Sequence, residues 1–143
     1  MSELEVLEAG MRDGVPAIRL RLAFGPGGAG DFVSLSLGPY ALSVQGDIRV
    51  LRARVSVADA TNLANAFIVV REWEAQGAYV RQANYPVRLP AENAVCVAGL
   101  EVREPNRVLQ PVLALQKRDN TAAGSVVIDI SGLAFAPLHE LLA

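Results

Sequence analysis

Residues 17–37 read AIRLRLAFGPGGAGDFVSLSL, which is two stretches of alternating residues on either side of a glycine-rich segment. In the first stretch Leu20 and Leu22 share one face, with Arg19 and Arg21 opposite. Successive side chains of a β-strand point to opposite faces, so this alternation predicts two half-buried strands. We interpret residues 17–37 as a β-hairpin with a long glycine loop at residues 25–30.

The same period-two alternation recurs along the rest of the chain. Only two short segments, 59–65 and 137–143, are expected to form a helical turn, the first capped by Asp59. Strands are predicted at residues 17–24, 31–37, 40–44, 48–57, 66–73, 78–82, 94–102, 107–116 and 125–131. Short strands at such regular spacing are typical of a sandwich or barrel. We predict an all-β protein, an antiparallel β-sandwich of jelly-roll type with eight to ten strands, forming one domain over residues 1–143.

Two irregularities refine this picture. Ile48 and Val50 lie in phase with Arg52 rather than with the apolar face downstream, which predicts a bulge or a strand that passes between two sheets. Pro86 and Pro90 lack a backbone N–H and bracket a short segment, which indicates an edge strand or a loop. Pro111 indicates that the strand at residues 107–116 is also an edge strand.

The residue types that carry most enzyme chemistry are nearly absent. The chain has one histidine, His139, one cysteine, Cys96, and one lysine, Lys117. Proton transfer, thiol attack, Schiff-base chemistry and zinc binding rely mainly on these types. Cys96 lies in an apolar stretch and is expected to be buried. We therefore predict a protein that is not an enzyme and has no cofactor and no metal site.

One literal motif match is set aside. Gly25, Gly27 and Gly30 fit G-x-G-x-x-G, the dinucleotide-binding fingerprint. That fingerprint requires a helix after the loop, because the helix N-terminus holds the pyrophosphate. Here an alternating strand follows, so the segment is interpreted as a hairpin tip.

Three carboxylates were considered further. Glu72 and Glu74 project from one strand face and could form the acid pair of a β-sandwich hydrolase. A solvated strand end explains the two residues with fewer assumptions. Asp129 is expected either to face solvent or to pair with an arginine.

Aromatic residues cluster around one predicted hairpin. Trp73, Tyr79 and Tyr85 lie close together in sequence, and Arg71 and Arg81 are interleaved with them. Exposed rings would suit the stacking of sugar rings. Packing in the core or at a protein interface, where aromatic residues and arginine are also enriched, is the other interpretation.

Composition bears on partners. Apolar residues make up 52% of the chain and charged residues 20%, and the formal net charge is −2. The apolar excess predicts a homo-oligomer, with a trimer as the first guess. With no basic tail and no membrane-length apolar run, no nucleic-acid or membrane partner is expected. The acidic N-terminal segment differs from a targeting peptide, so synthesis in a cytoplasm is expected.

These observations support two functional hypotheses. The first is a structural subunit that self-associates through its sandwich faces, such as a viral capsid, head-decoration or other virion protein. That hypothesis rests on analogy at the level of the fold. The alternative is a carbohydrate- or peptide-binding module that uses the hairpin between Trp73 and Tyr85.

Overall fold

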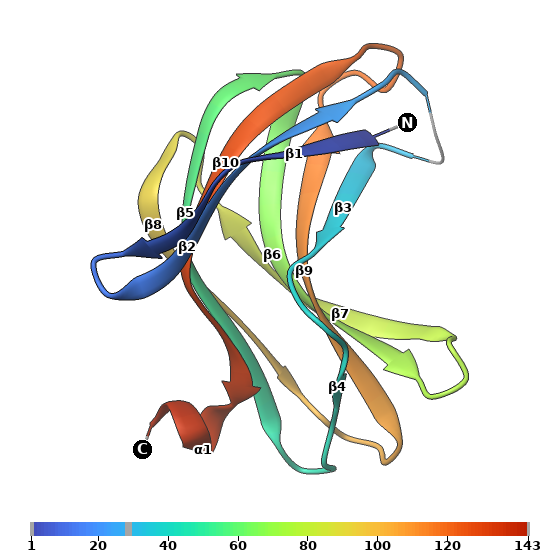
Figure 1. Ribbon diagram of the computed structural model, residues 1–143. Coiled ribbons are helices and arrows are strands. Elements are labelled where there is room, and N and C mark those ends of the chain that lie inside the picture. The colour runs from blue at the N-terminus through green and yellow to red at the C-terminus, as the bar shows by residue number, and fades with distance from the viewer. Residues whose placement is uncertain (1, 28–29, 143) are drawn as a thin grey trace.

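The computed structural model describes residues 2–27 and 30–142 and consists almost entirely of β-strands (Figure 1). Within these residues ten strands and one four-residue helix follow one another along the chain. They are β1 (Ser2–Arg12), β2 (Val15–Phe24), β3 (Phe32–Ser36), β4 (Ala41–Leu42), β5 (Ile48–Thr61), β6 (Leu63–Glu74), β7 (Tyr79–Val87), β8 (Ala91–Glu101), β9 (Arg107–Lys117), β10 (Gly124–Pro137) and α1 (Leu138–Leu141).

The strands form two antiparallel sheets. Sheet A has the order β1-β2-β10-β5-β8, and sheet B has the order β3-β9-β6-β7, with β4 pairing further along β9. β10 lies between β2 and β5 in one sheet, and β9 lies between β3 and β6 in the other. This nested order is that of a jelly roll, which is built from two Greek keys. The predicted all-β antiparallel sandwich of jelly-roll type is confirmed.

The core lies between the sheets and is built from the inward positions of the alternating strands. Its fully buried members include Leu51, Val55, Ile68, Val70, Leu109, Leu113, Leu115 and Ile128. Burial of each such side chain contributes about 1.5–3 kcal/mol to stability. The predicted face of Leu20 and Leu22 is part of this core, while Arg19 and Arg21 point to the other side of β2.

The predicted hairpin over residues 17–37 is wrong, although both of its strands exist. β2 pairs with β1 and β10, whereas β3 pairs with β9 in the opposite sheet. The glycine segment therefore connects the two sheets, and its residues 28 and 29 lie outside the described residues. The actual hairpin partner of β2 is β1, which the alternation did not reveal. Asp13 and Gly14, both with positive φ, form the turn between them.

The two proline predictions have different outcomes. Pro86 lies in β7, which is an edge strand as expected. Pro111 lies in β9, in the interior of sheet B, so the edge prediction for that strand is wrong. The carbonyl of Pro111 accepts from the N–H of Leu37, just after β3 ends. The missing N–H of Pro111 therefore falls at the interruption between β3 and β4, where no ladder partner is required.

The segment around residues 59–65 is also not helical. β5 continues to Thr61, and β6 begins at Leu63. Asp59 and Asn62 adopt positive φ angles of 48° and 57°, so the chain turns there without a helix. β5 stays within sheet A and does not pass between sheets. The irregularity appears as register shifts, one of them in β10 between Ser131 and Ala134.

The three chemically versatile residues occupy structural positions. Cys96 is buried in the core, as predicted. Lys117 donates to the carbonyl of Gly27 and to Asn120 Oδ1 at 2.8 and 2.9 Å, and so ties two loops together. His139 is exposed on α1, the predicted C-terminal helical turn. Among the described residues, no helix is long and apolar enough to cross a bilayer.

Candidate functional site

The outer face of sheet B, turned away from sheet A, carries an ordered pair of aromatic rings. Trp73 in β6 lies opposite Tyr79 in β7, next to the turn of their hairpin. The rings meet edge to face with centroids 5.8 Å apart. The indole Nε1 donates to Gln110 Oε1 of β9 at 3.1 Å. These contacts fix the Trp73 ring, while Tyr79 remains 54% exposed.

A third aromatic residue lies beside this pair. Tyr40, in the loop before β4, is 57% exposed and lines a shallow pocket of about 250 Å³ together with Trp73 and Val108. Glu74 and the turn residues Ala75 and Gly77 complete the lining of the pocket at the hairpin end. Aromatic side chains from the β3–β4 loop and from the β6–β7 hairpin thus surround one hollow on this end of sheet B.

Next to the aromatic residues, the outer face carries carboxamide side chains that bond to neighbours on the same strand or on the adjacent strand. Arg71 Nε donates to Gln82 Oε1 at 3.0 Å, and Gln82 Nε2 donates to Asn84 Oδ1 at 2.9 Å. Towards the other end, Asn65 Nδ2 donates to Gln116 Oε1 at 2.8 Å. Each carboxamide has two donors and an acceptor with two lone pairs, so the network keeps capacity to bond a ligand.

An apolar floor lies between these groups. Val69, Val112 and Ala114 are buried although they point away from the core, and Phe67 packs against them. Phe67 also lies 6.2 Å from Phe32 of β3, measured between ring centroids. Phe67 precedes Trp73 by six residues along β6, which corresponds to about 20 Å. The face is therefore long enough for several sugar-sized units, with aromatic rings at both ends.

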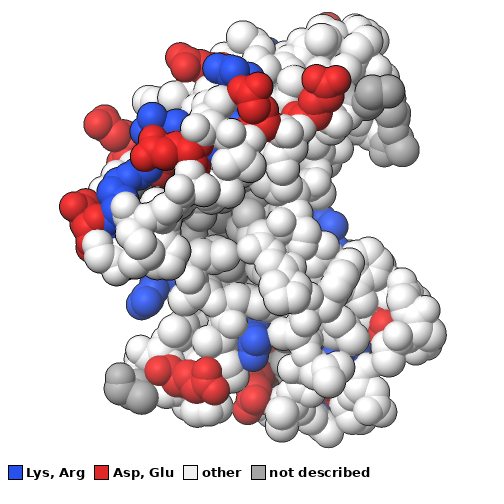
Figure 2. Space-filling view, in the orientation of Figure 1, with Lys and Arg blue, Asp and Glu red and all other residues white. Residues whose placement is uncertain are grey.

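The outer face of sheet B is almost uncharged. Of the outward positions in β3, β4, β6, β7 and β9, all of which the structure describes, only Arg71 carries a charge. Figure 2 shows the charged side chains gathered mainly over sheet A, whereas the side carrying β3 and β7 is mostly uncharged and is indented above the β6–β7 hairpin. The face therefore suits a ligand recognised by hydrogen bonds and ring contacts.

The five residues that the sequence grouped together divide between the two faces of sheet B. Arg71, Trp73 and Tyr79 share the outer face, as described above. Arg81 and Tyr85 lie on the opposite face of β7. Arg81 bonds the carbonyl of Glu101 in β8, and Tyr85 lines a separate cleft between β7 and β8. The predicted cluster is therefore only partly one site.

Glu72 is neither solvated nor half of an exposed acid pair, so both interpretations of it are wrong. It shares the inward phase of Ile68 and Val70 and is 1% exposed. Its carboxylate lies 2.8 Å from Arg81 Nε and 3.2 Å from Arg107 Nε. Glu72 thus neutralises two arginines beneath the Trp73 end of the sheet.

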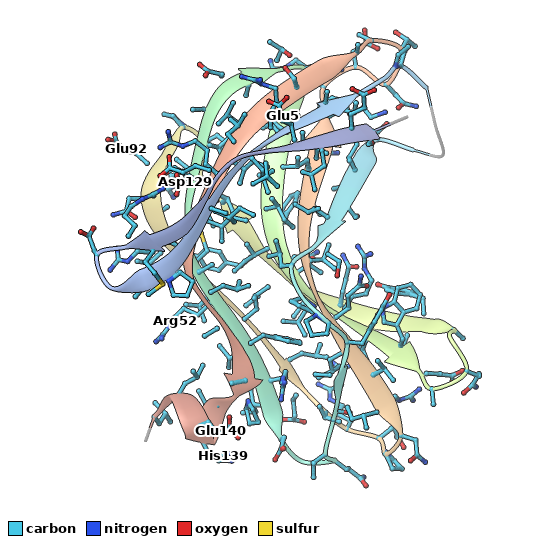
Figure 3. The ribbon with its side chains drawn as sticks, viewed as in Figure 1. Glu5, Arg52, Glu92, Asp129, His139 and Glu140 are labelled. Carbon is cyan, nitrogen blue, oxygen red and sulfur yellow. The ribbon has the colours of Figure 1, made fainter. Side chains whose placement is uncertain are left out.

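The outer face of sheet A is polar and charged. Asp129 in β10 accepts two bonds from the guanidinium of Arg12, at 2.7 and 2.9 Å, and one from Arg19 Nε at 3.2 Å. Of the two alternatives stated for Asp129, pairing with arginine is correct. The bonds from Arg12 hold the pKa of Asp129 below its ordinary value, against the opposing effect of burial. Figure 3 shows Asp129 and Glu92 on this side, and they line a hollow of about 700 Å³ with Arg54.

Sequence reasoning missed most of the polar members of the sheet B site. Gln82 and Asn84 alternate with inward residues in β7, so their shared phase with Trp73 follows once the hairpin register is known. Gln110 lies 37 positions from Trp73, and only the pairing of β6 with β9 brings the two together. Tyr40 carried no local signal beyond its aromatic ring.

Comparisons with known proteins give structural neighbours only. No protein-family model matches the chain, and no curated protein matches it. One solved structure is similar over 94% of this chain, with a TM-score of 0.62 and 11% identity. Its description concerns the promiscuous specificity of carbohydrate-binding modules from the β-sandwich superfamily. This chain spans 53% of that one, about half its length.

Two further solved structures have lower TM-scores. A CBM4 protein aligns over 94% of this chain and 77% of its own, with 10% identity and a TM-score of 0.45. The enzymatically active domain of tailspike protein 4 of bacteriophage CBA120 aligns over 91% of this chain and 15% of its own, with 12% identity and a TM-score of 0.38. At these identities the likeness concerns the fold.

The comparisons correct the first functional hypothesis. The prediction of a capsid, head-decoration or other virion subunit is wrong, because a solved structure that shares the sandwich over 94% of this chain is described among carbohydrate-binding modules. The predicted trimer has no support from the comparisons either. The fold defines this protein as an antiparallel β-sandwich, and the outer face of its sheet B carries the candidate site.

Proposed function

We propose that this chain is a non-catalytic carbohydrate-binding module whose ligand lies across the outer face of sheet B. The observation that carries the proposal is the placement of Trp73 and Tyr40 around one hollow, with Tyr79 against the Trp73 ring and carboxamides beside them on an open sheet face. Sugar rings present a patch of C–H groups to an aromatic face and hydroxyls to amide donors and acceptors. Both kinds of partner are present within one surface.

The fold supports the same proposal. The β-sandwich neighbour with a TM-score of 0.62 is described as a carbohydrate-binding module. A peptide ligand fits the site less well. An extended peptide commonly adds to a sheet edge through backbone hydrogen bonds, whereas the aromatic residues here lie on a face, between β4 and β7.

The test is binding to a panel of polysaccharides and oligosaccharides, with Trp73→Ala and Tyr79→Ala as variants. Trp73 is the only tryptophan of the chain, so its fluorescence reports directly on the site in the unmodified protein. We expect a bound glycan to shift the emission and to protect it from iodide quenching. Truncation of a central aromatic contact commonly costs about 2 kcal/mol, so Trp73→Ala should raise Kd about thirtyfold.

The matched control is Tyr85→Ala. Tyr85 belongs to the same strand as Tyr79 and is 39% exposed, but it lies on the other face of β7. Its replacement should leave Kd within about twofold of the unmodified protein. The proposal fails when no glycan of the panel is bound, or when a folded Trp73→Ala variant binds as tightly as Tyr85→Ala.

A further inference from the structure

Among the described residues, Arg71 is the single cation at the outward positions of the sheet B strands, and it bears on the charge of the ligand. Arg71 lies in β6, between Gln110 of β9 and Gln82 of β7. Its side chain is partly buried, and its Nε is engaged by Gln82. Because Gln82 is in turn bonded to Asn84, the guanidinium is held in place by neutral groups.

Arg71 differs from the two arginines on the other face of sheet B at this end. Arg81 and Arg107 pair with the carboxylate of Glu72, whereas Arg71 has no such partner among the described residues. Among the described residues, no acidic side chain lies within 4.0 Å of the Arg71 guanidinium. The two terminal nitrogens of Arg71 form no hydrogen bond with any described residue, and only its Nε is engaged.

A guanidinium fixed at Nε with both terminal nitrogens available is matched to an oxyanion. The planar fork donates two parallel hydrogen bonds to a carboxylate or a sulfate, and it loses little freedom when it is already oriented. Arg71 and Trp73 are two residues apart on one face of β6, a spacing of about 6.7 Å. A sugar stacked at Trp73 would therefore place the acidic group of that ring, or of the next ring, at Arg71.

We infer that the ligand is an acidic glycan, whose carboxylate or sulfate group is bound by Arg71 next to the ring stacked at Trp73. This inference rests on the proposed carbohydrate-binding function and specifies its ligand class. Arg71 is the specificity-determining residue, while the aromatic residues provide contact area common to neutral and acidic chains.

The test uses pairs of polysaccharides that share a backbone and differ in charge. Polygalacturonate against its methyl ester tests carboxylate recognition, and a sulfated galactan against the neutral galactan tests sulfate recognition. We expect the unmodified protein to bind one acidic polymer at least tenfold more tightly than its neutral partner, since charge-assisted hydrogen bonds are about twice as strong as neutral ones. The preference should shrink as salt concentration rises.

Arg71→Gln should abolish the preference for the acidic partner, because the guanidinium that binds the oxyanion is removed. Arg71→Lys keeps the positive charge but removes the planar guanidinium, so part of the preference for the acidic partner should remain. The difference between the two variants separates the effect of charge from that of the paired hydrogen bonds. Arg52→Gln is the matched control, because Arg52 is an exposed arginine of sheet A in the opposite layer (Figure 3). It should retain the full preference.

The outcomes separate this inference from the function on which it rests. Equal binding of acidic and neutral partners, with loss of both in Trp73→Ala, would overturn the acidic-glycan inference and leave the carbohydrate-binding proposal standing. A preference for acid that survives in Arg71→Gln would also overturn the assignment to Arg71. Failure to bind any polymer of either pair or of the wider panel would overturn both proposals.

Discussion

Glu72 shows how one buried charge supports the surface above it. Its carboxylate lies between Arg81 and Arg107, and the next residue along β6 is Trp73 on the opposite face. Glu72→Gln keeps the shape but leaves Arg81 without a counter-charge and leaves Arg107 with only the half-exposed Glu74. Because Arg81 is partly exposed, we expect a loss of about 2–3 kcal/mol in unfolding free energy, less than the roughly 3–5 kcal/mol of fully buried pairs. Urea denaturation measures this loss.

Glu74→Gln is the control for that substitution. Glu74 lies 3.4 Å from Arg107, but its side chain is 39% exposed. Exposed ion pairs contribute about 0–1 kcal/mol, so this variant should lose less than about 1 kcal/mol. Equal losses of unfolding free energy in Glu72→Gln and Glu74→Gln would show that the stabilisation by Glu72 does not depend on its burial.

The inward orientation of Glu72 could have been derived from the sequence, because it shares the phase of Ile68 and Val70. The interpretation as a solvated strand end gave the charge more weight than the phase. The partner of Asp129 was less accessible. Arg12 lies 117 positions away along the chain, and it reaches Asp129 because β2 lies between β1 and β10. Side-chain phase is a local property, whereas pairing is set by topology.

At the level of elements, Gly124 is the described glycine with the least space for a side chain. It begins β10 opposite Phe24 of β2. A Cβ at this position would lie 2.5 Å from Phe24 Cε2 and from the carbonyl oxygen of Thr61, and 2.8 Å from Asn62 Cβ. A backbone oxygen cannot move aside as a flexible side chain does. Gly124→Ala should therefore lower the unfolding free energy by about 1–3 kcal/mol, as overpacking does elsewhere.

Gly99→Ala provides the comparison for Gly124→Ala. Gly99 also lies in a strand of sheet A, but its nearest atoms to an added Cβ are 3.9 Å away, which is ordinary van der Waals contact. We expect the unfolding free energy of the Gly99→Ala variant to stay within about 0.5 kcal/mol of that of the unmodified protein. Thermal or urea unfolding of both variants under one buffer condition decides between crowding at Gly124 and a general effect of glycine in strands.

The sequence located most strands but not all of their partners. Alternation identified the strand containing Leu20 but not its hairpin partner. The hairpin turn is Asp13-Gly14 before this strand, whereas the glycine loop after it is a crossing between the sheets. Pro111 was misleading for a related reason. A proline removes one backbone hydrogen bond, to the neighbouring strand on one side only. At Pro111 the neighbour on that side is the break between β3 and β4, where no strand is left without a partner.

At the scale of the whole molecule, the candidate site is a product of the jelly-roll order. The sequence placed Arg71, Trp73 and Tyr79 on one hairpin, and that part of the prediction matches the structure. Gln110 joins them only because β9 runs beside β6, and Tyr40 joins them because β4 pairs with β9. Contacts of this kind depend on pairing between strands that are far apart in the sequence. The alternation of apolar and polar residues does not indicate which strands pair.

The expected self-association of the chain can also be located in the fold. β1 is the edge strand of sheet A, and Leu4, Val6 and Met11 in it are 51%, 55% and 69% exposed. We propose that a second copy covers this apolar side of β1. Light scattering should then give a mass above that of one chain, rising with concentration. The double substitution Leu4→Ser with Val6→Ser should reduce that mass, whereas Leu142→Ser, at an exposed position beyond α1, should leave it unchanged.

Self-association through β1 would leave the outer face of sheet B free, because β1 belongs to the other sheet. Two or more sites on one particle bind a polymer with avidity that exceeds the affinity of a single site, often by a factor of about 100 or more. The β1 double variant should therefore lose retention on an immobilised polysaccharide while its Kd for a short oligosaccharide stays unchanged. A monomeric mass for the unmodified protein at every concentration, or parallel changes in polymer retention and oligosaccharide Kd, would contradict this arrangement.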